Sequence, residues 1–229
     1  MSRFFFLPSG YFFSLLIFWI YALLSFPFGG QLLVSIIATV ILYATRRKQI
    51  PFRDTLRTEG EIYLSPVHGE VRSIRRSVSL PGFPQLGIEV RISVGDWSEK
   101  GLYLPTTGEV SYLKATKGRR ISRYAEAQDF YGPVDEIAHT DFLLTSKNRT
   151  QTLLRFIDAR YGRRPTIWLK SGDRGRGAAC FGYYPFGGTL LVYLPPWSDI
   201  LVFENEKVVP GQSVLAAIKD QDYARKRTS

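Results

Sequence analysis

The chain has 229 residues, of which 45% are hydrophobic, and it carries a formal net charge of +10. This length accommodates one membrane segment and one soluble domain large enough to bury its own core. One cysteine and two widely separated histidines exclude a disulfide framework and a metal-ligand cluster, so we expect no bound metal. The basic residues are not arranged as a recognition helix or an RNA-binding aromatic motif, so we expect no nucleic-acid partner.

The N-terminal part of the chain is uncharged and mostly apolar from Phe4 to Thr45. A helix needs only about 20 residues to cross a hydrocarbon core of about 30 Å, so this stretch is long enough for a hairpin. Pro27 and the glycines after it interrupt the stretch, which predicts helices over Tyr11–Ser25 and Gln31–Thr45. Each predicted helix is shorter than an ordinary span, so full spanning and re-entrant insertion both remain open.

Positive charges flank this predicted transmembrane hairpin on both sides, whereas its central turn has none. Because basic flanks favour the cytoplasmic side, both ends of the hairpin are expected in the cytoplasm of a bacterial-type cell. We therefore assign residues 1–48 to an anchor in the inner membrane and residues 49–229 to a cytoplasmic domain. A cleavable signal peptide is the competing interpretation, but no small-x-small cleavage site follows the first apolar segment.

A group of basic residues follows the apolar stretch and is expected to lie beside the membrane surface. We call it the juxtamembrane cluster, and it consists of Arg46, Arg47, Lys48, Arg53 and Arg57. Each basic residue near an anionic surface contributes about 1 kcal/mol of binding free energy. The cluster therefore predicts contact with anionic phospholipids. A second basic segment, Lys170–Arg176, is glycine-rich but has no Walker pattern, so it is only a weak signal for phosphate binding.

The remainder of the chain has the residue pattern of β-strands. Apolar and polar residues alternate over Val71–Val78, Ile88–Val94 and Thr189–Leu194, and proline or glycine separates such runs at short intervals. Helical periodicity is limited to short stretches within Ser122–Phe130 and Val214–Arg225. We therefore predict a compact, mainly β domain of the sandwich or barrel type.

Several short motifs occur in a fixed order along this domain. They are Pro51–Arg57 (PFRDTLR), Ser65–Val71 (SPVHGEV), Ser93–Ser98 (SVGDWS), Pro105–Val110 (PTTGEV), Lys170–Asp173 (KSGD), Phe186–Gly188 (FGG), Tyr193–Pro195 (YLP) and Val209–Val214 (VPGQSV). In order and spacing they resemble the short, single-domain, membrane-anchored members of the phosphatidylserine decarboxylase family. The resemblance implies a β domain of that family's type and an enzyme that makes phosphatidylethanolamine with a pyruvoyl cofactor.

The sequence departs from the family at the three positions where the resemblance places catalysis. His68 replaces the family's acid, Ser98 replaces its histidine, and Gly188 replaces the serine that becomes the pyruvoyl group. Self-processing needs a hydroxyl that attacks the preceding carbonyl and then leaves by β-elimination, and glycine has none. We therefore expect no pyruvoyl cofactor and no catalytic residue in this catalytically degenerate member.

Two residues keep an enzymatic alternative open. Thr189 has a hydroxyl one position later and is a remote candidate for processing to a ketobutyryl group. His68 can act as a base near neutral pH, although a base without an electrophilic cofactor cannot accept the electrons released as carbon dioxide leaves. The alternative function is thus an active decarboxylase with a non-standard processing site.

The leading hypothesis is a membrane-anchored, catalytically inactive relative of the decarboxylase. It would act as a scaffold or accessory subunit of a larger integral membrane protein complex, with anionic phospholipid contact. Candidate contacts for the partner, or for a groove, are the aromatic residues Tyr183, Tyr184, Phe186 and Trp197, although such residues more often belong to a core or its rim. A lipid-headgroup binder that acts alone is a third possibility.

Overall fold

The structure is a computed structural model, and the chain divides into two compact units, residues 1–49 and 50–229. It describes residues 19–21, 30, 35–37, 39, 61–95, 98–120, 137–158, 164–185 and 187–218. The juxtamembrane cluster, Phe186, the predicted helix within Ser122–Phe130 and most of the predicted hairpin lie outside these residues.

In the first unit, residues 19–21 and 35–37 are helical. Trp19 Nε1 donates a hydrogen bond to Ser35 Oγ at 3.2 Å, so these two helical segments lie side by side. Thr39 Oγ1 in turn donates to the Ser35 carbonyl oxygen at 2.8 Å. No helix among the described residues combines the length and the apolar character that a bilayer crossing requires.

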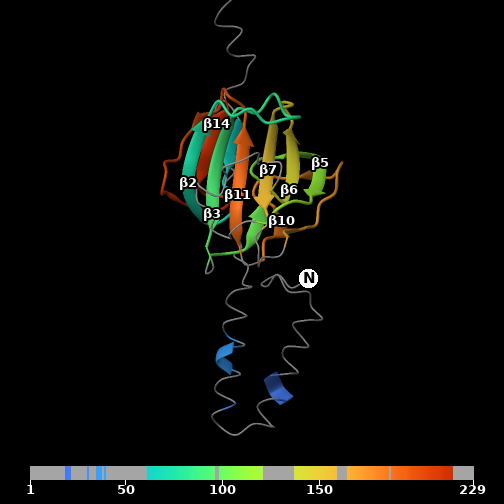
Figure 1. Cartoon of the computed structure of the whole chain (residues 1–229), viewed down its shortest axis with the longest axis vertical. Helices are drawn as coiled ribbons and strands as arrows, with labels where there is room; N and C mark the ends of the chain where they lie inside the picture. The colour runs from blue at the N-terminus through green and yellow to red at the C-terminus, as the bar shows by residue number, and fades with distance from the viewer. Residues whose placement is uncertain are drawn as a thin grey trace, which may run out of the picture. The chain divides into compact units, whose positions relative to one another are not determined.

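The described residues of the second unit form three β-sheets, in which every pairing between strands is antiparallel (Figure 1). The large sheet has eight strands in the order β13 (Lys207–Val208), β2 (Gly69–Arg76), β3 (Ile88–Val94), β11 (Gly188–Leu194), β7 (Gln151–Ile157), β6 (His139–Ser146), β5 (Gly108–Thr116) and β9 (Arg174–Gly175). One small sheet has the order β1 (Glu61–Leu64), β14 (Val214–Ile218) and β12 (Asp199–Ile200). The other has the order β4 (Gly101–Tyr103), β10 (Cys180–Tyr183) and β8 (Thr166–Ile167).

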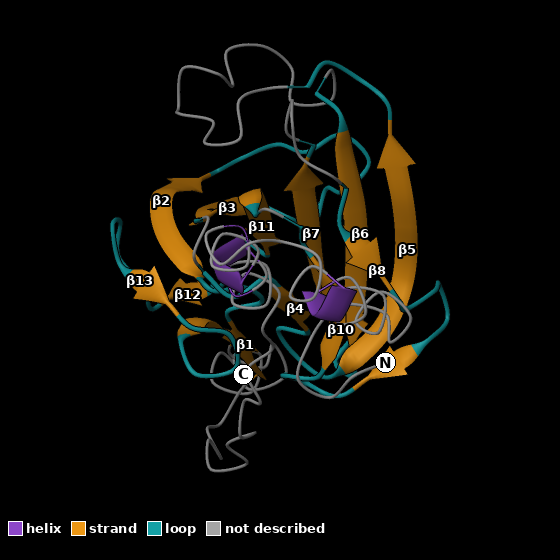
Figure 2. Cartoon of the chain, turned by 90° about the horizontal axis from the view of Figure 1, so that it is seen from below, coloured by secondary structure: helices purple, strands orange, loops and turns teal. Residues whose placement is uncertain are grey.

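The main core lies between the large sheet and the two small ones. Side chains of alternate residues on β3, β6, β7 and β11 enter it together with Tyr63 of β1, Leu102 of β4 and Phe181 of β10. The rings of Phe142 and Phe181 stack with centroids 4.5 Å apart, which joins the large sheet directly to a small one. Figure 2 shows the large sheet as an arc with the small sheets along one side of it. The predicted mainly β domain is therefore confirmed.

The opposite face of the large sheet is covered as well. A second apolar cluster there joins Leu143, Leu153 and Leu191 to Leu80 and Leu86, which come from the loop between β2 and β3. Because both faces are buried, every residue of β11 is buried, including the polar Thr189. This strand sits between β3 and β7 and forms the centre of the sheet.

Charged side chains are buried on this second face. Arg155 of β7 donates to the Asp141 carboxylate from Nε at 2.7 Å and from Nη2 at 2.9 Å. His139 Nε2 lies 3.5 Å from the same carboxylate, and the Arg155 guanidinium lies 5.8 Å from the ring centroid of Tyr193. Burial alone would raise the pKa of Asp141, but the hydrogen bonds from His139 and Arg155 outweigh it and lower that pKa.

The three predicted strands are present as β2, β3 and β11, and Ile88–Val94 has the predicted bounds. The predicted helical turn within Val214–Arg225 is wrong in its described part, because Val214–Ile218 forms β14. This strand pairs with β1 on one side and β12 on the other. Those two partners are distant in sequence, so local periodicity could not indicate the pairing.

The Asp141–Arg155 pair predicts a loss of stability in acid. A carboxylate whose folded pKa is lowered adds stability that is complete above its ordinary pKa of about 3.9 and is lost as the pH falls through the folded value. Asp141→Asn should lower the free energy of unfolding at pH 7 by about 3–5 kcal/mol, because it leaves Arg155 buried without its counter-ion. It should also flatten the dependence on pH below about 4.

Urea unfolding of the full chain in detergent at a series of pH values measures both effects. Asp199→Asn is the control, since Asp199 is exposed, and its expected effect is within about 0.5 kcal/mol. If the free energy of unfolding falls equally steeply with decreasing pH in wild type and in Asp141→Asn, the Asp141–Arg155 pair is not the source of the acid sensitivity.

Candidate functional site

The predicted catalytic positions lie where β2, β3 and β11 meet. Ser93 near the end of β3 pairs with Glu70 on one side and with Thr189 on the other. Gly188 opens β11 opposite Val94, the last residue of β3. The start of β2, the end of β3 and the start of β11 therefore share one end of the large sheet (Figure 1).

His68 and Ser98 approach this end from the flanking segments. His68 is half-buried and immediately precedes Gly69, where a Cβ would lie 2.4 Å from the Ser93 carbonyl oxygen. Ser98 closes the turn after β3, with its N–H donating to the Gly95 carbonyl oxygen at 3.3 Å. The structure thus brings His68, Ser98 and Gly188 to the same end of three neighbouring strands.

Gly187 and Gly188 adopt backbone conformations that favour glycine. Their φ angles are 68° and 140°, and the turn before them is closed by the Gly187 N–H, which donates to the Tyr184 carbonyl oxygen at 3.1 Å. A Cβ on Gly187 would lie 2.3 Å from the Val94 carbonyl oxygen. A Cβ on Gly188 would lie 2.5 Å from Tyr184 Oη. Neither position has room for a side chain without a shift of its neighbours.

Tyr184 fills the space beside Gly188. Its ring is buried and meets Phe156 edge to face at a centroid distance of 5.6 Å. Its hydroxyl donates to the Ile157 carbonyl oxygen at 2.7 Å and lies 3.5 Å from the Thr189 carbonyl oxygen. These contacts fix the hydroxyl between the end of β7 and the start of β11, where the first side-chain atom of a serine at position 188 would be.

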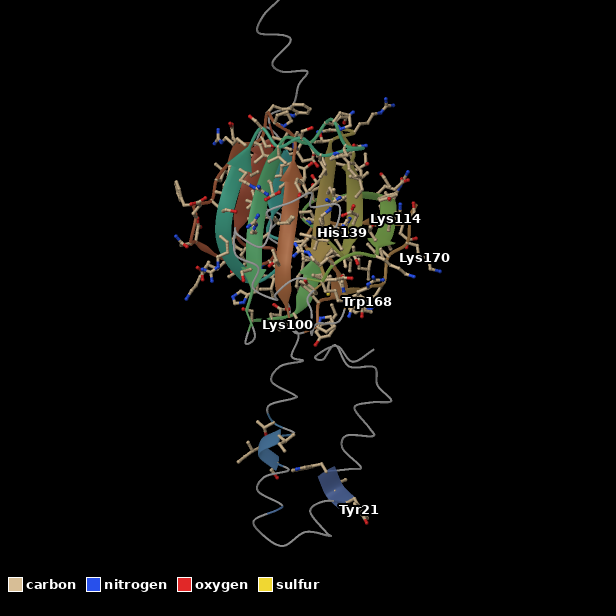
Figure 3. All side chains as sticks on the ribbon, viewed as in Figure 1. Tyr21, Lys100, Lys114, His139, Trp168 and Lys170 are labelled. Atoms are coloured by element: carbon tan, nitrogen blue, oxygen red, sulfur yellow. The ribbon has the colours of Figure 1, made fainter. Side chains whose placement is uncertain are left out.

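Lys100 is the residue of this centre that sequence reasoning missed. It is only 2% exposed, and its ammonium donates to the Gly95 carbonyl oxygen. A Cβ on Gly187 would lie 3.1 Å from Lys100 Nζ, so the ammonium is next to the two glycines. Figure 3 shows Lys100 at the end of the sheet where β11 begins. The signal that the sequence offered was the position of Lys100 directly before the apolar residues that form β4.

The other predicted site residues are placed as follows. Thr189 lies inside the β11 ladder and is 3% exposed. Tyr183 ends β10 and is half-buried, and burial raises its pKa. Trp197 is 43% exposed and lies beyond the far end of β11, so the structure does not bring it to the centre.

The residues present do not fit a pyruvoyl group, because Gly188 has no hydroxyl from which one could form. The described residues contain no group of three or more His, Cys, Asp or Glu side chains placed to hold a metal ion. This centre is therefore a tightly packed junction of three strands, with one buried ammonium and one buried phenol.

Comparison with known proteins shows which proteins this chain is similar to. No family model matches the chain. It is, however, 28% identical over 187 residues to the phosphatidylserine decarboxylase proenzyme of Symbiobacterium thermophilum, a match that covers 80% of this chain and 83% of that protein.

The proenzyme of the same name from Parabacteroides distasonis is 21% identical over 81% of this chain and 82% of its own length. That from Amoebophilus asiaticus is 23% identical over 73% and 72%, respectively. The resemblance carried by the motifs is thus confirmed: the chain is similar, over most of its length, to several proteins named phosphatidylserine decarboxylase proenzyme.

The geometry at Gly188 predicts that restoring serine does not restore self-processing. Gly188→Ser should remain a single chain, because its Cβ would overlap Tyr184 Oη and its φ disfavours a side chain. It should also lower the free energy of unfolding, the strained backbone alone contributing about 1–3 kcal/mol. Intact mass and urea unfolding measure the two effects.

Gly172→Ser is the matched control, because Gly172 has a φ of 91° and no atom lies within 4 Å of the point that its Cβ would occupy. Gly172→Ser therefore measures the cost of backbone strain without any steric overlap. Gly188→Ser adds the overlap with Tyr184 and should lower the free energy of unfolding further. Tyr184→Phe combined with Gly188→Ser should recover part of the difference. Cleavage of Gly188→Ser into two chains would refute the packing argument.

Proposed function

We propose that this protein is a membrane-anchored, catalytically inactive relative of phosphatidylserine decarboxylase. It acts as a scaffold or accessory subunit of a larger integral membrane protein complex in a bacterial-type inner membrane, with its β domain in the cytoplasm. The observation that carries the proposal is Gly188: it stands where the resemblance places the self-processing serine, and a Cβ there would lie 2.5 Å from Tyr184 Oη.

The chemistry supports an inactive centre. Decarboxylation of an amino-acid headgroup needs an electrophile that forms a Schiff base with the amine and takes up the electrons released with carbon dioxide. The Lys100 ammonium and the Tyr184 phenol are proton donors, and neither supplies a carbonyl carbon. His68 retains a group that can move a proton, but proton transfer alone does not break the carbon–carbon bond.

The anchor is supported by the uncharged stretch from Phe4 to Thr45 and by the hydrogen bond between Trp19 and Ser35. That bond joins two segments on opposite sides of Pro27, as a helical hairpin requires. In an apolar environment a polar side chain on one helix is stabilised by a partner on the other. The juxtamembrane cluster would then lie at the surface of the lipid headgroups.

A partner surface is supported by exposed apolar side chains around β12. Trp197, Leu201 and Phe203 are 43%, 53% and 78% exposed, and they lie close together in the sequence. Most other large apolar side chains of the described part of this domain are buried or partly buried. Exposed aromatic and aliphatic groups of this kind mark protein contacts. Phe203 is held in position by a turn in which its N–H donates to the Glu206 carboxylate at 2.9 Å.

Processing distinguishes the inactive protein from the alternative enzyme. We expect protein purified from its native membrane to give one uncut chain by denaturing gel and intact mass, because residue 188 has no hydroxyl. Two chains, with a keto-capped fragment that begins at position 188 or 189, would replace this proposal with an active decarboxylase processed at a non-standard site. A curated relative with the usual serine serves as the positive control for cleavage.

Purification in mild detergent tests the scaffold role. The tagged chain should recover an integral membrane protein in fixed ratio, and Trp197→Ser/Leu201→Ser/Phe203→Ser should reduce that recovery at least several-fold without unfolding the domain. Lys114→Ser is the control, since Lys114 is exposed on β5 of the large sheet, whereas β12 belongs to a small sheet. Unchanged recovery with the triple variant, or recovery of lipid alone, would count against the scaffold role.

A further inference from the structure

A basic groove lies at the end of the large sheet opposite to Gly188. It has a volume of about 680 Å³, and its lining includes Thr107, Ser146, Lys147, Arg149, Arg174 and Arg176. It is bordered by the start of β5, by the turn between β6 and β7, and by β9. Because β11 pairs antiparallel with β7, the start of β7 lies beside the end of β11, away from Gly188. The groove is therefore separate from the degenerate centre.

The charge of the groove is strongly positive. Four of its described lining residues are cations, whereas Glu109 is the one acidic residue among them and already accepts from Arg174 Nε at 2.9 Å. Within the described part of the chain, neither Lys147 nor Arg149 pairs with a carboxylate, and both are exposed. Cations gathered around a concave surface attract an anion more strongly than the same charges dispersed over a convex one.

Arg149 occupies a backbone position that does not suit it. Its φ is 60°, in the left-handed region that glycine and asparagine adopt more easily. The turn is closed by the Ser146 N–H, which donates to the Thr150 carbonyl oxygen at 2.9 Å, and by the Arg149 N–H, which donates to the Ser146 carbonyl oxygen at 3.1 Å. Strained backbone conformations of this kind are common at binding sites, so the φ of Arg149 at the edge of the groove indicates a binding role for its side chain.

The Thr107 hydroxyl is a neutral donor in the lining of the groove. Thr107 Oγ1 accepts the Gly177 N–H at 2.9 Å, so its own hydroxyl proton is left to donate. Ser146 Oγ instead donates to the Glu61 carboxylate at 2.7 Å, and that carboxylate also accepts from Thr106 at 2.9 Å. Glu61 is thereby tied to two hydroxyl groups beside the groove.

We propose that this groove binds a phosphate-bearing anion, held by the guanidinium groups of Arg149 and Arg176, the Lys147 ammonium and the Thr107 hydroxyl. Guanidinium groups match phosphate oxygens in pairs, and the ammonium adds a compact charge. A free phosphate compound and a phospholipid headgroup share this chemistry. The inference goes beyond the scaffold function and does not depend on it.

Titration calorimetry of the full chain in neutral detergent, with inorganic pyrophosphate as the probe, tests the site. Wild type should show saturable binding that weakens as salt is added. Lys147→Gln/Arg149→Asn should bind about tenfold more weakly and remain at least as stable in urea, because asparagine tolerates the left-handed position. Lys114→Gln, which removes a positive charge outside the groove, is the control and should bind like wild type.

A second arm distinguishes the two sources of phosphate. The full chain in phosphatidylcholine nanodiscs is mixed with a short-chain phosphatidylglycerol below its micelle concentration, and then with pyrophosphate. A headgroup site binds the lipid in competition with pyrophosphate, whereas a site for free phosphate compounds binds pyrophosphate alone. The proposal is overturned if wild type shows no saturable binding of either probe, or if the double variant binds both as wild type does.

Discussion

The position of the Tyr184 hydroxyl, 2.5 Å from the point that a Cβ on Gly188 would occupy, determines what the start of β11 can accommodate. The hydroxyl is fixed by its bond to the Ile157 carbonyl oxygen at the end of β7, so it cannot withdraw without leaving a buried acceptor unpaired. Gly188 in turn adopts a φ that a side chain would strain. Position 188 therefore has no hydroxyl and, unless Tyr184 shifts, no space for a side chain.

The burial of both faces of the large sheet explains how the strand junction at Gly188 is held in place. One face packs against two small sheets, and the other carries an apolar cluster together with the paired charges of Asp141 and Arg155. Because β11 lies between β3 and β7, its position is determined by the ladders on both sides. The conformation at Gly188 is thus maintained by packing that has no direct part in chemistry.

Sequence reasoning predicted part of the candidate site. Motif order indicated His68, Ser98 and Gly188, and strand pairing brings all three to one end of the sheet. Lys100 was missed because the turn after β3 directs it toward Gly187, and no periodic pattern encodes the direction of a turn. Trp197 was grouped with the centre because it follows nearby aromatics in sequence, yet the extended β11 carries the chain to the opposite end.

The sequence by itself determined the β content, three of the strands and the absence of a hydroxyl at position 188, because alternation and side-chain identity are local properties. It could not determine that Val214–Ile218 is a strand, since its partners Glu61–Leu64 and Asp199–Ile200 are supplied by distant segments. The tertiary structure alone placed Tyr184 against Gly188 and gathered Lys147, Arg149 and Arg176 around one groove. The Tyr184 hydroxyl is held beside Gly188 by its hydrogen bond to Ile157, 27 residues earlier, and the groove joins Lys147 and Arg149 to the distant Arg176, so both arrangements depend on the packing of the whole domain.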